Sequence, residues 1–214
     1  GEIHGQNGGY PIAIALSNDA VKLAVSMINI NEGSVKSTIA FYNYGTVGQN
    51  EIDHCVGVNN YDDMVIPEME FTSNDRMVAF GDTKAVIFEG AQKPQAIAEI
   101  PMDEKTKSIF YNEHYIGIVT GNEDEAVTNH LAVYDENGKL VMEKDFGLDY
   151  SSIEFLTNNE ICIRNANVCD IYTVHGVYKF HHEFEEELFE IIPGKLKLNY
   201  TLVLKDTTQR IRLK

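Results

Sequence analysis

Residues 14–26 read IALSNDAVKLAVS, and a related stretch, MEFTSNDRMVAFG, returns at residues 69–81. Each stretch consists of two short apolar runs joined by a polar turn. Asn and Asp tolerate left-handed backbone and hydrogen-bond to their own main chain, so they suit tight turns between antiparallel strands. The recurrence therefore predicts a β-hairpin that has been copied along the chain.

The hairpin returns twice more, as SIFYNEHYIGIVT at 108–120 and IEFLTNNEICIRN at 153–165. A third apolar run follows each hairpin, and a fifth run of this kind, QRIRLK, lies at 209–214. A fourth run (EIDHCVG, QAIAEIP, LVMEKDF or VYKFHHEFE) follows the third run in each of the first four units. Such a unit of four antiparallel strands has the length of a β-propeller blade. Equivalent positions in the third runs lie 46, 46, 38 and 40 residues apart: Tyr42, Phe88, Tyr134, Tyr172 and Arg212. The turns of the four hairpins carry Asn18, Asn74, Asn112 and Asn158.

The sequence thus predicts an all-β fold, a propeller of about five blades in a single domain over residues 1–214. The last blade lacks its outer strand, and two arrangements are open. Either Glu2–His4 supplies that strand and closes a five-blade ring, or the chain is the carboxy-terminal part of a larger propeller. Only Glu183–Ile192 has a period that also suits a helix. The approximate blades are 10–58, 62–102, 105–147, 150–186 and 187–214.

Several turn sequences carry a family resemblance. SNDAVKLAVS at 17–26 resembles the S-x-D-G-x-x-L-A hairpin of WD-repeat-like and TolB-like propellers, with Ala20 in place of the usual glycine. YDENGKLVMEKDF at 134–146 resembles the turn between the outer strands of such blades. AFYNYGTVGQNEID at 40–53, with YDDMVIP at 61–67, resembles an uncharacterised bacterial family of WD-repeat-like propellers. That resemblance implies an amino-terminal membrane anchor and a location outside the cytoplasm, and it implies no chemistry.

The charge balance excludes some partners. The chain has 33 acidic and 17 basic residues and a formal charge of −16. Such a surface repels nucleic acid and lacks the polybasic patches that bind anionic lipids. We interpret the charge as a solubilising surface, with a calcium-dependent surface as the alternative.

Metal ligands are sparse. His181 and His182 are neighbours on a predicted strand and therefore point to opposite faces, and His175 lies in a turn. The acidic segments 121–129 and Tyr61–Asp63 do not match a calcium-binding loop. We expect no metal and no cofactor.

The three cysteines are Cys55, Cys162 and Cys169, and their odd number leaves at least one unpaired. Cys162 should lie opposite Ile171, not opposite Cys169, so buried free thiols are favoured over a disulfide. His54 and Cys55 are adjacent on a strand and cannot form a nucleophile–base pair. The sequence contains no G-x-S-x-G motif and no phosphate-binding loop, so no catalytic residues are predicted.

These observations favour a non-catalytic, extracytoplasmic binding module for a protein or glycan partner, with pairing of copies through exposed blade edges. Its mouth would be formed by the loops Gly45–Glu51, Asn59–Asp63 and Gly121–Asn129. The alternative is a carbohydrate-active hydrolase or lyase that uses two carboxylates at the propeller axis. A structural piece of an envelope assembly, with a broad exposed apolar patch, is a third hypothesis. For the hydrolase or lyase alternative, the candidate catalytic acids lie on the first strand of each blade: Glu68, Glu70, Glu154 and Glu190.

Overall fold

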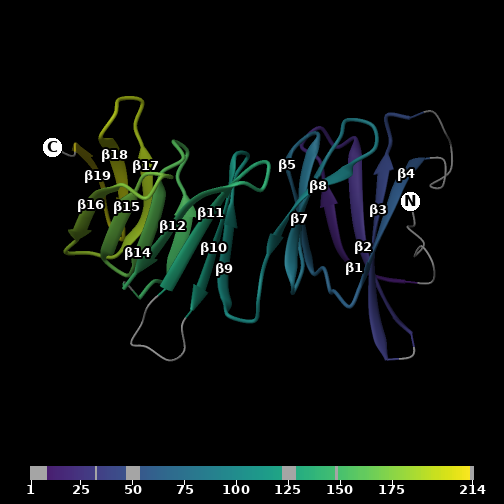
Figure 1. Ribbon diagram of the computed structural model, residues 1–214. Coiled ribbons are helices and arrows are strands. Elements are labelled where there is room, and N and C mark those ends of the chain that lie inside the picture. The colour runs from purple at the N-terminus through teal and green to yellow at the C-terminus, as the bar shows by residue number, and fades with distance from the viewer. Residues whose placement is uncertain (1–8, 32, 47–53, 122–128, 148, 213–214) are drawn as a thin grey trace. The chain divides into compact units, whose positions relative to one another are not determined.

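The computed structural model describes residues 9–31, 33–46, 54–121, 129–147 and 149–212 (Figure 1). These residues form 19 strands in five antiparallel sheets, four of four strands and one of three. Each sheet is a meander in which strands adjacent in sequence are paired. The predicted all-β fold is confirmed, and in the segment that also suited a helix Glu183 ends one strand and Leu188–Ile192 lie in the next. The chain divides into two compact units, 1–104 and 105–214. That the units form one domain stays a prediction.

The first unit contains two sheets, and their first strands, β1 and β5, lie side by side. The sheets pack through a core that includes Phe41 and Phe88, whose ring centroids are 5.1 Å apart. Side chains alternate along the strand, so Tyr42 enters a separate cluster on the other face of the first sheet. The strands are β1 (Tyr10–Leu16), β2 (Lys22–Asn31), β3 (Ser34–Asn43), β4 (Cys55–Asp62), β5 (Glu68–Ser73), β6 (Arg76–Phe80), β7 (Lys84–Glu89) and β8 (Gln95–Pro101).

The second unit contains three sheets. One core joins the third sheet to the fourth, and in it the ring centroids of Phe110 and Phe155 lie 4.5 Å apart. A second core joins the fourth sheet to the fifth and includes Cys162, Ile171 and Leu202. The strands are β9 (Thr106–Tyr111), β10 (Tyr115–Gly121), β11 (Asn129–Asp135), β12 (Leu140–Phe146), β13 (Ser152–Phe155), β14 (Ile161–Asn165), β15 (Val168–Tyr172), β16 (Tyr178–Glu183), β17 (Leu188–Pro193), β18 (Asn199–Leu204) and β19 (Thr208–Arg212).

A bulge recurs at the same place in all four of the four-stranded sheets. The register between third and fourth strands shifts immediately before Tyr42, Phe88, Tyr134 and Tyr172. These are the positions that the sequence analysis aligned as equivalent, so the repeat is confirmed at the level of single residues. Each bulge leaves one residue of the outer strand without a partner: Val56, Ile97, Val141 and Lys179.

The turn chemistry explains why the hairpins form where they do. Ala20, which replaces the usual glycine, adopts a positive φ of 58°, and Gly138 adopts 74°. The Asn112 side chain accepts hydrogen bonds from the backbone of His114 and Tyr115. In the first copy Asp19, not Asn18, has this role, since its carboxylate accepts from Val21 N.

Two loop predictions change. Asn59–Asp63 is not a mouth loop, because Asn59–Asp62 continue β4. The neighbouring strand β3 is ten residues long, so it supplies backbone partners for β4 as far as Asp62, which pairs with Lys36. Most of Gly45–Glu51 and of Gly121–Asn129 lies outside the described residues, as does Glu2–His4.

Candidate functional site

The candidate catalytic acids do not form a site within either unit. Glu68 and Glu70 lie on the exposed side of β5, while the residues between and after them, Met69 and Phe71, enter the core. In the second unit Glu190 is exposed on β17. Glu154 accepts a hydrogen bond of 2.7 Å from Arg164 Nη2. Alternation along β5 thus explains Glu68 and Glu70, and an ion pair explains Glu154.

Arg164 gives this ion pair a structural role. Its Nη2 also contacts Ser152 Oγ at 3.2 Å, and its Nη1 donates to the backbone oxygens of Leu188 and Phe189. Arg164 thus links the fourth sheet to the first strand of the fifth. Glu154 orients this guanidinium and is not available as a free carboxylate.

The histidines behave as strand residues. His181 Nδ1 lies 2.6 Å from Asp170 Oδ1 on the neighbouring strand, and His182 lies between Phe180 and Phe184. The two histidines thus have different surroundings, as expected from alternation. No group of three or more metal-ligating side chains occurs among the described residues.

The cysteines are free thiols. Cys162 is opposite Ile171, as predicted, yet its sulfur lies 3.6 Å from that of Cys169. The hydrogen bond with Cys169 and burial both raise the pKa of the Cys162 thiol, so it is not an activated nucleophile. Cys55 is only half-buried. The ring of its neighbour His54 lies tilted against that of Tyr44, with the ring centroids 4.6 Å apart.

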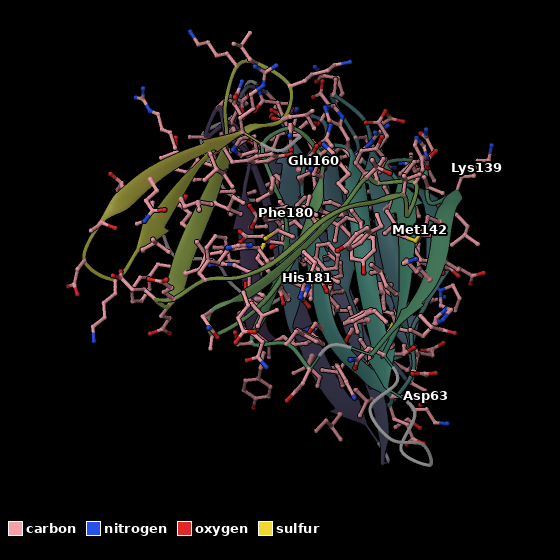
Figure 2. All side chains as sticks on the ribbon, turned by 90° about the vertical axis from the view of Figure 1, so that its left-hand side faces the viewer. Asp63, Lys139, Met142, Glu160, Phe180 and His181 are labelled. Atoms are coloured by element: carbon pink, nitrogen blue, oxygen red, sulfur yellow. The ribbon has the colours of Figure 1, made fainter. Side chains whose placement is uncertain are left out.

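A buried cluster that the sequence analysis missed joins the fourth sheet to the fifth. Glu160 precedes β14 and is 8% exposed. One of its carboxylate oxygens pairs with Lys179 Nζ, and the other accepts a hydrogen bond of 2.5 Å from the Tyr200 hydroxyl. Lys179 Nζ also lies 3.2 Å from that hydroxyl. Figure 2 labels Glu160 near the turns at one end of the strands, with His181 further along them.

The cluster alters two pKa values. Burial alone would lower the pKa of Lys179, but its hydrogen bonds to Glu160 and Tyr200 and the nearby negative charge raise it overall. Burial and the hydrogen bond to Glu160 raise the pKa of Tyr200. The ammonium and the neutral phenol are therefore both favoured at neutral pH.

This cluster lies at the side of a cavity of about 550 Å³. The loop between β17 and β18 forms much of the cavity wall and brings Lys195 and Lys197 beside Glu160 and Lys179. A second cavity, of about 500 Å³, lies against the same loop and is bounded by Arg210 and Arg212 of β19. We call the loop, Gly194–Leu198, the 194–198 hairpin.

Lys179 occupies a special position in the repeat. It is the unpaired bulge residue of the fourth sheet, where the other three sheets have Val56, Ile97 and Val141. An aliphatic side chain is thus replaced by a cation only at the sheet that borders the cavity. Comparison of the aligned outer strands could have identified this position from sequence.

A different surface is apolar. On β1 the side chains of Tyr10, Ile12, Ile14 and Leu16 are 76%, 40%, 63% and 56% exposed. Ile14 and Leu16 lie on one face of the first sheet, since they pair with Val25 and Leu23, whereas the register shift at Ile12 places Tyr10, which pairs with Ile28, on the other face. The apolar stripe of Ile12, Ile14 and Leu16 has the character of a packing surface.

Comparison with known proteins places the chain in a family. The sequence matches a family of unknown function, DUF5711, over residues 1–213. The chain belongs to the DUF5711 family. No curated protein sequence matches this DUF5711 chain. Within the described residues no helix is long and apolar enough to cross a membrane.

Solved structures with TM-scores above 0.5 confirm the predicted β-propeller fold. The β-propeller domain of the Trilobed protease from Pyrococcus furiosus is 10% identical with a TM-score of 0.53, and the match covers 95% of this chain and 70% of that one. Sqt1 from Chaetomium thermophilum is 13% identical with a TM-score of 0.52, covering 91% and 55%. The WD40 domain of Neurospora crassa Pan2 is 11% identical with a TM-score of 0.45, covering 96% and 63%. The DUF5711 chain therefore spans less than two thirds of the Sqt1 and Pan2 structures. At these identities the likeness concerns the fold alone.

Proposed function

We propose that this DUF5711 chain is a non-catalytic binding module that acts outside the cytoplasm and holds its ligand at the 194–198 hairpin. The observation that carries the proposal is the pair of cavities on this one exposed loop, with the Glu160–Lys179–Tyr200 cluster fixed between the two sheets. A propeller presents such loops on a rigid scaffold, as binding sites require.

The chemistry of the cluster supports binding rather than turnover. A general acid or base works best with a pKa near the operating pH, whereas Lys179 and Tyr200 both have raised pKa values. Their carboxylate partner is engaged through both oxygens. The cluster can orient a ligand at the cavity wall without exchanging protons with it.

The location outside the cytoplasm is supported by the resemblance of residues 40–53 and 61–67 to membrane-anchored bacterial propellers. It can be tested on the natural gene product in its own cells. External protease should degrade the propeller in intact cells if the proposal is correct. Degradation only after lysis would contradict the location and leave the binding role open.

A binding experiment tests the site. The purified chain is presented to arrays of glycans and peptides, with calcium and with a chelator. Leu196 is 73% exposed, so Leu196→Trp should fill cavity space without disturbing the core, and it should abolish the strongest signal. Leu140→Trp is the matched control, because Leu140 is 43% exposed on the third sheet and borders neither cavity. Equal loss in both variants, or no binding in any condition, would refute the proposal.

The exposed β1 stripe favours a second candidate role, as an assembly surface for a second copy of the chain. Burying such a stripe in a dimer would remove apolar area from water. Ile14→Lys should then lower the dimer fraction in sedimentation velocity, with Leu140→Lys as the control. A monomeric wild-type protein at high concentration would exclude this role.

A further inference from the structure

The basic residues of this acidic chain are concentrated at its end. Residues 194–214 contain six of the 17 basic residues and one of the 33 acidic residues. The remaining 193 residues therefore carry 11 basic and 32 acidic side chains. Five cations and a single acid, Glu160, line the two cavities at the 194–198 hairpin: Lys179, Lys195, Lys197, Arg210 and Arg212.

The cations of the larger cavity have different roles. Glu160 neutralises Lys179, and Glu160 and Tyr200 together fix its position. Lys195 and Lys197 are exposed, and neither has an ion-pair partner among the residues that the structure describes. The cavity thus keeps two uncompensated positive charges beside a rigid floor. An anion would be attracted to this site and repelled by most of the remaining surface.

The neutral groups of the cavity suit a hydroxyl-rich ligand. Asn158 and Asn199 supply amide groups, which both donate and accept, whereas the Tyr200 hydroxyl is already engaged by Glu160 and Lys179. The charges here are ammonium groups, which pair with carboxylates as point charges without the planar bidentate geometry of arginine. Sugar hydroxyls and carboxylates match this set of partners.

Among the strands that border the cavities, β16 and β19 are outer strands of their sheets in the described part of the chain, whereas β18 offers no edge for a peptide. Tyr200 belongs to β18, which pairs with β17 on one side and with β19 on the other. A peptide that binds by strand addition needs an unpaired edge, and that mode is excluded at β18. The 194–198 hairpin is a loop, and a loop suits a compact ligand better than an extended peptide.

We propose that the cavity between the 194–198 hairpin and Lys179 binds a carboxylate-bearing glycan, such as one containing uronic acid. This inference rests on the proposed function and specifies its ligand. Lys195 and Lys197 attract the carboxylate, while Asn158 and Asn199 contact the hydroxyls. Lys179, held by Glu160, is a positioning residue that keeps the wall of the cavity in place.

The experiment uses the full chain and isothermal titration calorimetry with an oligogalacturonate and with its methyl ester, which has the same size and no charge. The acidic glycan should bind and the ester should not. The double variant Lys195→Gln/Lys197→Gln should weaken binding by up to about thirtyfold, since each lost charge pair contributes up to about 1 kcal/mol. Lys36→Gln/Lys84→Gln removes the same charge from the first two sheets and should leave the affinity unchanged. Circular dichroism verifies that all variants are folded.

The outcomes separate the two proposals. If a neutral glycan or a peptide binds and Leu196→Trp abolishes it, the binding function stands and the acidic-glycan inference is wrong. If poly-glutamate binds as tightly as the glycan, or the two double variants lose affinity equally, the site recognises charge alone and the inference is also wrong. If no ligand of any class binds, both proposals fail.

Discussion

Each unit has a lysine that fastens two neighbouring sheets, and the two differ in their acidic partners. In the first unit Lys22 Nζ donates to Asn74 O at 2.6 Å and pairs with Asp75, whose side chain is 55% exposed. In the second unit Lys179 pairs with Glu160, whose side chain is 11% exposed and also bonds Tyr200. Lys22 binds the turn between β5 and β6 at the protein surface, whereas Lys179 lies at the wall of a cavity.

The difference shows that a lysine–carboxylate pair between two sheets can have different effects, depending on the burial of the carboxylate. An ion pair with an exposed carboxylate is weakened by solvent and contributes little to stability. A buried carboxylate must keep its partners, because losing one leaves an uncompensated charge or an unpaired polar group. We therefore expect the second cluster to be rigid, which a binding site requires.

Loss of the carboxylate should show the largest contrast. Glu160→Leu removes the partner of Lys179 and of the Tyr200 hydroxyl, and we expect a loss of about 3 kcal/mol in the free energy of unfolding. Asp75→Leu, its counterpart, should cost about 1 kcal/mol, because Asp75 is 55% exposed and the buried Lys22 ammonium keeps its hydrogen bond to Asn74 O. Urea denaturation followed by circular dichroism measures both. Equal losses would show that the two lysine clusters do not differ.

In the first unit, a buried neutral hydrogen bond should contribute more to the free energy of unfolding than the Lys22–Asp75 ion pair. Ser26 Oγ donates to Ile66 O at 2.8 Å, and both residues are fully buried. Ser26→Ala leaves this carbonyl unpaired and should cost about 1–2 kcal/mol in the same assay. Ser34→Ala, at an exposed position of β3, is the control and should have no measurable effect. A smaller loss than that of Asp75→Leu would reverse this ranking.

Alkaline pH should weaken the second cluster by a smaller amount. The pKa of Lys179 is raised above its ordinary value of 10.5, so its contribution is complete below that pH and is lost as the pH rises through the raised value. Tyr200 acts in the same direction. The urea midpoint of the wild type should fall above about pH 10.5 more steeply than that of Lys179→Met. Parallel curves would contradict the coupling.

Tyr61, in the first unit, gives the smallest and most specific signal. Burial and the nearby charge of Glu99 raise the pKa of its phenol to about 12. An ultraviolet titration of tyrosinate absorbance should contain a late step that Tyr61→Phe removes. Tyr10→Phe, at a residue that is 76% exposed, should not remove that late step. Loss of an earlier step in Tyr61→Phe would show that the phenol is solvated.

The sequence was sufficient for the repeat because its signals are local. The Asn and Asp turns and the aromatic that follows each bulge are visible within one unit, and the structure reproduces them at Tyr42, Phe88, Tyr134 and Tyr172. The exception was Asn59–Asp62, because two asparagines suggest a loop although the long strand β3 supplies partners.

The candidate site could not be predicted in the same way. Glu160, Lys179 and Tyr200 are separated by 19 and 21 residues and meet only when the fourth sheet packs on the fifth. Their packing depends on which side chains cross between sheets, and a strand pattern does not specify that. Two signals were available: the basic excess after residue 193, and the cation at a bulge position that is otherwise aliphatic.

The recurring bulges also determine where the protein is vulnerable to misassembly. An extra residue bends and twists the outermost strand, so β4, β8, β12 and β16 present irregular templates to another chain. The pairing of β18 with β19 has no such shift, and β19 is the outer strand of its sheet among the described residues. Fibre growth under partly denaturing conditions should therefore start at β19, where Arg210 and Arg212 are the gatekeepers that slow it.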